Sequence, residues 1–311
     1  MKIVFMGTPE FAVPCLEMLI NSQHSVVAVV TTPDKPSGRG LKLRPSPVKI
    51  VAMENNLLIL QPEKLKDPKF IDQLQSLKAD LYVVVGFRIL PPMVFTIPPK
   101  GTINVHASLL PRYRGAAPIQ WAIIKGETET GVTIFSIDEH IDTGRIILQE
   151  KIPILPDENA GDIHEKLMHL GANLLNEAIE LIEAGKAKPQ KQVGEVTLAL
   201  KIKREHCRID WSKDADSIHN LVRGLSPYPT AFTVLNGKII KILKTKPIRK
   251  KIPSNFRCGE ICLVNNKAGI IRVATGLGLI EILELQLEGR RRMSSSEFLR
   301  GHTLEKHQLF E

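Results

Sequence analysis

Short apolar runs alternate with amphipathic segments along the first half of the chain. The apolar runs, which predict strands, lie at residues 3–6, 25–30, 57–60, 81–85, 103–105 and 131–137. Residues 10–20 and 68–77 carry apolar side chains at helical spacing, and so does a longer segment at 163–184. Apolar strands separated by helices are typical of a parallel sheet that is covered on both faces. Ligands of such sheets bind beyond the carboxyl ends of the strands, so we expect functional residues in the segments that follow the strands.

The second half has a different pattern. Short β-branched runs, which predict strands, lie at 231–235, 239–244, 259–264, 269–274 and 279–285. Asn236-Gly237 joins the first two runs and is typical of a hairpin turn. Five or six short strands with such turns favour a small β-barrel. We therefore predict one domain at 1–185, a linker at 186–204 and a second domain at 205–311.

The charge is concentrated in the second half. The formal net charge is +9, but residues 1–185 have 18 basic and 21 acidic side chains, whereas residues 186–311 have 24 basic and 12 acidic ones. A near-neutral segment joined to a strongly basic one indicates an enzyme with a polyanion-binding attachment. A solvated basic surface with no partner is the alternative.

Composition excludes several classes of protein. With 43% hydrophobic and 24% charged residues, the chain is neither disordered nor collagen-like. Its four cysteines do not make a disulfide framework, and Cys258 and Cys262 have poor zinc spacing, so we predict no metal site. The sequence has neither an apolar run of about 20 residues nor a secretory signal, so we expect a cytoplasmic protein without membrane contact.

Residues 31–47, TTPDKPSGRGLKLRPSP, read as a long basic loop. Long loops inside compact domains are usually functional or disordered, and basic side chains on them suit contact with phosphates. An ordinary surface loop is the alternative. The turn after the first strand, Gly7-Thr8-Pro9, matches neither the dinucleotide fingerprint nor a phosphate loop.

The strongest chemical signal lies between residues 102 and 144. Asn104 and His106 are two positions apart, so on a strand their side chains point the same way, and Asp142 follows the next predicted strand. A carboxamide can stabilise an oxyanion, an imidazole can move a proton, and a carboxylate can orient the imidazole. Taken singly, each of the three could instead close a turn or be a satisfied polar residue. Ser108 lacks a nucleophile elbow, which favours direct transfer over a covalent intermediate.

NVHASLLPRYRGAAPIQWAI at 104–123, followed by GVTI and IDTG, resembles the formyltransferases that use 10-formyltetrahydrofolate, and most closely those that act on methionyl-tRNA. KIVFMGTPEFAVPCLEML, the loop at 31–47, CRIDW at 207–211 and ATGLGLIEILELQLEGRRRM extend the resemblance over nearly the whole chain. It implies a doubly wound catalytic domain, a C-terminal barrel resembling an OB fold, and transfer of a formyl group to the α-amine of methionyl initiator tRNA for translation initiation.

The resemblance also assigns residues. The catalytic trio falls on Asn104, His106 and Asp142. The folate segment falls on Ser108, Leu109, Leu110 and Pro111, and the pterin-side loop on Gly86, Phe87 and Arg88. We expect tRNA contacts from Arg39, Lys42 and Arg44 on the loop, with Arg39 in the key position, and from Lys244, Lys246 and Lys250 on the barrel. No obligate protein partner is inferred.

Two positions depart from the family pattern. Gly86-Phe87-Arg88 stands where Ala-Tyr-Gly is usual, and His140 replaces a glycine two residues before the aspartate. Both changes add bulk or charge beside the expected folate pocket. Three other functions stay open: a formyltransferase with another amine acceptor such as a nucleotide sugar, a folate hydrolase, and a noncatalytic RNA-binding protein.

Overall fold

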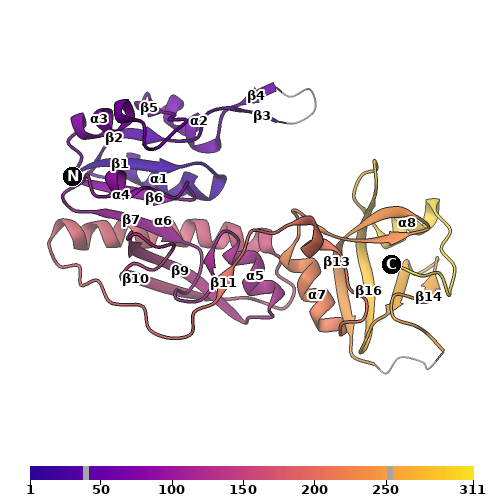
Figure 1. The fold of residues 1–311 in the computed structure, drawn as a ribbon. Coiled ribbons are helices and arrows are strands. Elements are labelled where there is room, and N and C mark those ends of the chain that lie inside the picture. Colours follow the sequence, from indigo (N-terminus) through magenta and orange to yellow (C-terminus); the bar gives the residue numbers. More distant parts are fainter. Residues whose placement is uncertain (38–41, 251–254) are drawn as a thin grey trace. The chain divides into compact units, whose positions relative to one another are not determined.

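The computed structural model describes residues 1–37, 42–250 and 255–311 and contains two compact units (Figure 1). The first unit comprises Met1–Gly115, Thr130–Ile152 and His164–Ala199, and the second comprises Ala116–Glu129, Pro153–Ile163 and Leu200–Glu311. The units are therefore not two continuous stretches of chain. Much of the expected linker, up to Ala199, belongs to the first unit.

A seven-stranded sheet forms the centre of the first unit, in the order β10-β9-β7-β6-β1-β2-β5. Its strands are β1 (Lys2–Gly7), β2 (Ser25–Val30), β5 (Ile59–Leu60), β6 (Leu81–Val85), β7 (Thr102–His106), β9 (Glu129–Ser136) and β10 (Ile146–Pro153). β1 pairs in parallel with β2 and β6, β2 with β5, and β6 with β7, whereas β7 and β9 are antiparallel. The predicted mostly parallel sheet is confirmed.

Helices cover this sheet, whose strands β1 and β6 are buried along almost their whole length. They are the 3-10 helix η1 (Glu10–Ala12), α1 (Val13–Ile20), α2 (Pro47–Glu54), α3 (Pro68–Ser76), α4 (Pro92–Phe95) and the long α6 (Ala160–Glu183). Phe70 and Leu74 of α3 pack in one cluster with Val4 and Met6 of β1. The Asp67 side chain accepts a hydrogen bond from the Lys69 N–H, which caps the start of α3.

The strand order changes direction at β1, which creates a switch point of the kind that binds ligands in such sheets. The chain moves from β1 to β2 on one side and later returns to β6 on the other. In the registers, Gly7 lies opposite Val85, and Val85 lies opposite Val105. The segments that follow β1, β6 and β7 therefore emerge at one edge of the sheet.

The basic loop is partly a β-hairpin, which sequence analysis did not predict. β3 (Lys35–Ser37) and β4 (Lys42–Arg44) are antiparallel, and Arg39 lies outside the described residues. At the base of the hairpin, Lys49 Nζ lies 2.7 Å from Asp34 Oδ2, and the Gln61 amide donates to Asp34 Oδ1. These hydrogen bonds hold the pKa of the Asp34 carboxyl below its usual value.

The second unit contains an antiparallel sheet in the order β12-β13-β16-β15-β14, with β17 paired to β16. Its strands are β12 (Ala231–Leu235), β13 (Lys238–Ile248), β14 (Ile261–Asn265), β15 (Ile270–Ala274), β16 (Leu279–Leu287) and β17 (Met293–Ser294). Its helices are α5 (Pro118–Ile124), the 3-10 helix η2 (Arg204–Cys207), α7 (Ala215–Gly224) and α8 (Ser295–Gly301). The sheet is consistent with the predicted small barrel.

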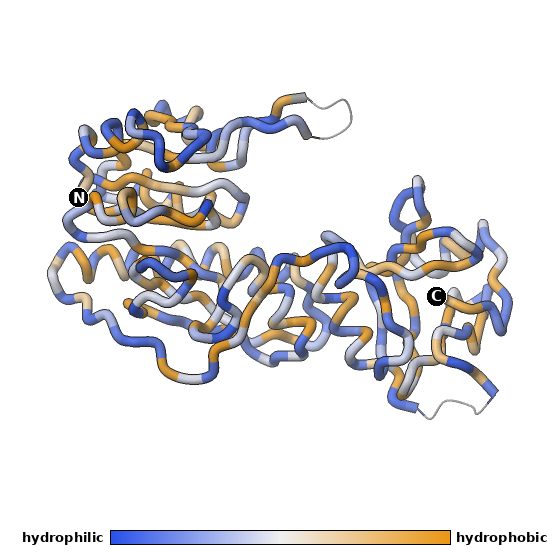
Figure 2. The backbone as a smooth tube through the Cα atoms, viewed as in Figure 1, coloured by the Kyte–Doolittle hydropathy of each residue, from blue (hydrophilic) through white to orange (hydrophobic). Residues whose placement is uncertain are grey.

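Hydrophobic and hydrophilic residues alternate along the strands of this second sheet, so one face is buried (Figure 2). The Asn236-Gly237 hairpin is confirmed: both residues have positive φ values, 50° and 73°, as the turn between β12 and β13 requires. Two short parallel strands in the first unit, β8 (Arg114–Gly115) and β11 (Leu198–Ala199), were not predicted.

Candidate active site

His106 ends β7, and Asn104 lies two residues before it on the same face of the strand. Asn104 is opposite Val84 of β6 and Phe135 of β9, so pairing on both sides fixes its backbone. The side chain is half-buried and, among the described residues, has no hydrogen-bond partner. Its amide is therefore free to donate to a ligand.

The buried His106 ring lies between a carbonyl and a carboxylate. Nε2 is 2.9 Å from the Tyr113 carbonyl oxygen, and Nδ1 is 3.7 Å from Asp142 Oδ2. Because a carbonyl only accepts, Nε2 carries the proton and Nδ1 is the basic nitrogen of the neutral ring. Sequence analysis expected Asp142 to orient the ring. The Tyr113 carbonyl lies at Nε2 and the Asp142 carboxylate lies near Nδ1, and that Asp142 orients the ring stays a prediction.

The carboxylate of Asp142 is held in place by its own turn. Asp142 has a left-handed backbone with φ of 54°, and its Oδ2 accepts a hydrogen bond of 2.8 Å from the Gly115 N–H. At Gly144, a Cβ would lie 1.6 Å from the Ser136 carbonyl oxygen, so only glycine lets this turn pass so close to β9. The structure thus brings His106 and Asp142 together, with Asn104 on the same strand face.

Ser108, Leu110 and Pro111 are buried, and Leu109 is half-buried. The Ser108 hydroxyl donates to the Arg112 carbonyl at 2.6 Å, which closes the turn after β7. From β9, the Thr133 hydroxyl donates to the Ser108 carbonyl. The Ser108 hydroxyl and carbonyl are therefore used in hydrogen bonds within the turn and to β9, and folate contact by the four residues of this segment stays a prediction.

The loop after β6 packs against the turn after β1. Gly86 has φ of 57°, and a Cβ there would lie 2.6 Å from the Pro9 ring. Arg88 donates to the carbonyls of Pro62 and Glu63 at 2.7 and 3.0 Å, and its guanidinium also lies over the Phe87 ring. Burial lowers the Arg88 pKa. The arginine that departs from the family pattern thus ties two loops together.

His140, the other departure, is exposed, and its backbone N–H donates to Asp138 Oδ1 at 3.0 Å.

Gln192 is a residue of this site that sequence analysis missed. Its Oε1 accepts hydrogen bonds from Arg114 Nη2 and Nε at 2.6 and 3.2 Å. Its Nε2 donates to the carbonyls of Asp142 and Gly144, both at 2.9 Å. The amide therefore clamps the turn that carries the Asp142 carboxylate. No motif marks this residue, which lies 50 positions from Asp142 in a segment without periodicity.

Comparison with known proteins identifies the family. The formyl transferase family matches residues 1–179, and the C-terminal domain of formyl transferases matches residues 201–303. The chain belongs to the formyl transferase family. The resemblance found in the sequence is confirmed.

Relatives of this formyl transferase cover almost its full length. It is 46% identical to the methionyl-tRNA formyltransferase of Bacteroides fragilis, over 98% of this chain and 96% of that protein. Two solved structures share the fold. An N-formyltransferase from Helicobacter canadensis has a TM-score of 0.64 at 22% identity, covering 91% of this chain and 99% of that one. The methionyl-tRNA formyltransferase from Clostridium thermocellum has a TM-score of 0.55 at 18% identity, covering 79% and 93%.

Of the basic residues expected to contact tRNA, the structure describes all except Arg39. Lys42 lies on β4, and Arg44 is exposed at its end. Lys244 and Lys246 are exposed on β13, and Lys250 follows that strand. Among the described residues, these three lysines have no ion-pair partner. Their positive charges are therefore available to a polyanion.

The acids opposite two of these lysines are already paired. Glu284 and Glu281 lie across from Lys244 and Lys246 in the register of β13 and β16. Glu281 lies 2.8 Å from Arg272, and Glu284 pairs with Arg292. The arginines thus neutralise the carboxylates that would otherwise offset the lysine charges.

The part of the chain that the structure describes shows no metal cluster, disulfide or membrane-spanning helix. Across the described ranges, no group of three or more His, Cys, Asp or Glu side chains is arranged to hold a metal ion. The four cysteines are free thiols. In the same ranges, no helix combines the length and apolarity needed to cross a membrane.

Replacing Gln192 by alanine should release the turn that carries Asp142. Two lost hydrogen bonds at about 1 kcal/mol each predict a fall in turnover of roughly 30-fold, with a smaller change in the KM of the formyl donor. Gln192→Ala is compared with Gln190→Ala in a formyl-transfer assay over a range of pH. The Gln190 side chain is exposed, and its backbone pairing with Ile146 survives truncation. Equal activity of the two variants would contradict the clamp.

Proposed function

We propose that this protein transfers the formyl group of 10-formyltetrahydrofolate to the α-amino group of methionyl initiator tRNA, giving N-formylmethionyl-tRNA for translation initiation. The observation that carries this proposal is the 46% identity to a methionyl-tRNA formyltransferase over 98% of the chain. Residues 1–185 would supply the catalytic domain, 186–204 the linker, and 205–311 the tRNA-binding domain. The partners are folate and initiator methionyl-tRNA, and the protein acts in the cytoplasm without an obligate protein partner.

The edge of the sheet at β1, β6 and β7 suits a folate ring system. Its loops, 86–88 and 108–111, emerge side by side because β6 and β7 are parallel neighbours. Half-buried Phe87 and Leu109 offer apolar surface, and Ile89 and Ile141 are 73% and 55% exposed. Apolar walls with a few polar groups are typical of small-molecule sites. We therefore assign Gly86, Phe87, Arg88 and 108–111 to the formyl donor.

Asn104 would act on the oxygen of the formyl group. When the amine attacks the formyl carbon, the carbonyl oxygen gains negative charge, and a preplaced N–H donor stabilises that charge. The side-chain amide of Asn104 has no hydrogen-bond partner in the described part of the chain, so no hydrogen bond has to break when it turns toward the substrate. Its backbone, paired on both sides, keeps the donor in position.

His106 would move the proton that the amine must lose. Nδ1 accepts this proton from the attacking nitrogen while Nε2–H stays on the Tyr113 carbonyl. The Asp142 carboxylate, 3.7 Å from Nδ1, stabilises the ring while it is positively charged. The proton then passes to the folate nitrogen as the old carbon–nitrogen bond breaks. One carbon–nitrogen bond forms, one breaks, and no redox change occurs.

Another amine acceptor is the main alternative. The Helicobacter canadensis N-formyltransferase, solved with folinic acid and dTDP-3-aminofucose, shares this fold. The excess of basic over acidic residues in 186–311, 24 against 12, favours an RNA acceptor. The unpaired Lys244, Lys246 and Lys250 support the same choice.

A transfer assay with labelled formyl donor tests the function. Methionyl initiator tRNA should be formylated, and methionyl elongator tRNA and a dTDP-amino sugar should be poor acceptors. The product is identified by acid-gel mobility of the tRNA and by release of N-formylmethionine. Label found on the sugar, or formate released without tRNA, would replace the proposed acceptor.

Replacing Asn104 by alanine should slow the chemical step. The loss of one oxyanion donor predicts a fall of about 10²–10³ in single-turnover rate with both substrates saturating. Binding of donor and tRNA should change little, and circular dichroism checks the fold. An unchanged rate would remove Asn104 from the mechanism.

Replacing Lys244, Lys246 or Lys250 by alanine should weaken tRNA binding at low salt. Each lost phosphate contact lowers the slope of log affinity against log salt by about 1. Fluorescence anisotropy over a salt series gives the slopes, and Lys69→Ala, which removes an exposed lysine on α3, is the matched control. Slopes equal to that of the control would exclude these lysines from the tRNA interface.

A further inference from the structure

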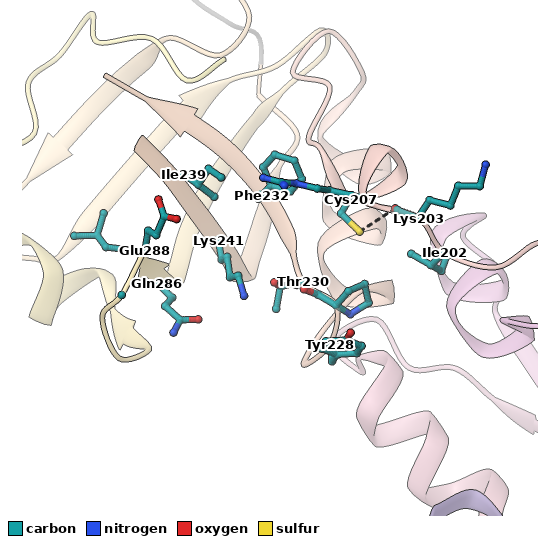
Figure 3. Close-up of a pocket in the computed structure, with 14 residues that line it drawn as sticks. Ile202, Lys203, Cys207, Tyr228, Thr230, Phe232, Ile239, Lys241, Gln286 and Glu288 are labelled. Carbon is teal, nitrogen blue, oxygen red and sulfur yellow. Dashed lines mark hydrogen bonds between the residues drawn. The ribbon is translucent and has the colours of Figure 1, made fainter. Parts of the chain in front are cut away.

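A cavity of about 540 Å³ lies in the second unit, beside β12, β13 and β16 (Figure 3). It is bordered by η2 and by the segment at 228–230. None of the residues assigned above to catalysis, folate or tRNA lines it. Its volume is in the range of sites that bind small organic molecules or single nucleotides, ~300–1,000 Å³.

The floor of the cavity is set by strand register. Lys241 of β13 lies opposite Phe232 of β12 on one side and Gln286 of β16 on the other. Residues directly opposite one another share a face, so these three side chains project together. Their chain neighbours Ala231 and Ile242 are buried, which leaves the cavity on the outer face of the sheet.

Flat and positively charged groups surround this floor. The guanidinium of Arg204 lies 5.8 Å from the centre of the Phe232 ring, and Arg204 is exposed. Tyr228 is 81% exposed at the rim. In Figure 3, the Lys241 ammonium points into the cavity, whereas the Lys203 side chain points away from it. Aromatic rings and guanidinium planes are the groups on which unpaired bases stack.

The charges in the cavity favour an anion that also carries hydrogen-bond donors. Arg204 and Lys241 provide two positive charges, and Glu288 provides one negative charge. A phosphate matches the cations, and an amino group on a base edge matches the Glu288 carboxylate. Inorganic phosphate would use the cations but leave the Tyr228 ring exposed. A nucleotide would contact the cations through its phosphate and the Tyr228 ring through its base.

We propose that this cavity binds one unpaired nucleotide of the tRNA, with its base stacked on Tyr228 and Arg204 and its phosphate on Lys241. This proposal rests on the proposed tRNA substrate. The exposed lysines of β13 act on the tRNA through charge alone. The cavity would add a second kind of contact, in which a base stacks on side chains. A stacked base contributes sequence-tolerant affinity, because every base has a π face.

The test measures the Kd and the KM for tRNA in variants of the full-length enzyme. Tyr228→Ala should raise both about 10-fold, Tyr228→Phe should restore them because the ring is kept, and turnover at saturating tRNA should be unchanged. Arg204→Ala should weaken binding more than Arg300→Ala, which removes an exposed arginine of α8 outside the cavity. Thermal unfolding of each variant checks the fold.

A second probe separates stacking from charge. An unstructured RNA tetranucleotide should bind the wild type more tightly than an abasic sugar-phosphate chain of the same length, and Tyr228→Ala should reduce that difference. If Tyr228→Ala binds tRNA like the wild type, or if Arg204→Ala and Arg300→Ala lose affinity equally, the nucleotide site is wrong. Formyl transfer to tRNA by the wild type would leave the proposed function intact in that case, whereas a wild type that does not formylate tRNA would refute the function itself.

Discussion

The proposed chemistry depends on two contacts of the His106 imidazole, one with the Tyr113 carbonyl and one with the Asp142 carboxylate. The carbonyl fixes which nitrogen is basic, and the carboxylate faces that nitrogen. Neither partner is close to the histidine by local geometry alone. The turn at 142–144 must pass against β9, and Gln192 must hold its carbonyls. A proton-transfer site of this kind is therefore a property of several packed segments.

Sequence analysis predicted best the segments that can be recognised from their own consecutive residues, without knowledge of what they pack against. Residues 26–30 and 81–85 are apolar throughout, and the structure has strands at Ser25–Val30 and Leu81–Val85. A strand buried on both faces needs no partner information to be recognised. The Asn236-Gly237 turn is equally local, because it depends on two residues that tolerate positive φ. The shared face of Asn104 and His106 was predictable for a similar reason, because side chains alternate along a strand, and their catalytic roles stay a prediction.

What sequence analysis missed depends on contacts between distant residues. Gln192 is an ordinary glutamine until the fold brings its amide to the Asp142 turn, and short-range patterns carry no sign of that. The segment that holds β3 and β4 was predicted as a loop because it has four prolines, two glycines and no clear apolar periodicity. Arg88 was expected to add charge beside the folate pocket. Its hydrogen bonds to the carbonyls of Pro62 and Glu63 depend on the packing of two loops.

The fold by itself does not select the acceptor. A solved N-formyltransferase in complex with dTDP-3-aminofucose shares the fold of this chain, and a shared fold does not fix the substrate. Selection has to come from surfaces outside the three residues proposed to catalyse the transfer. In the second unit, Arg272 and Arg292 neutralise the glutamates opposite Lys246 and Lys244, which leaves a lysine row without local compensation. Such an arrangement costs folding stability through charge repulsion, and a polyanionic partner removes that cost when it binds. The same physical feature would favour the proposed RNA acceptor over a small amine.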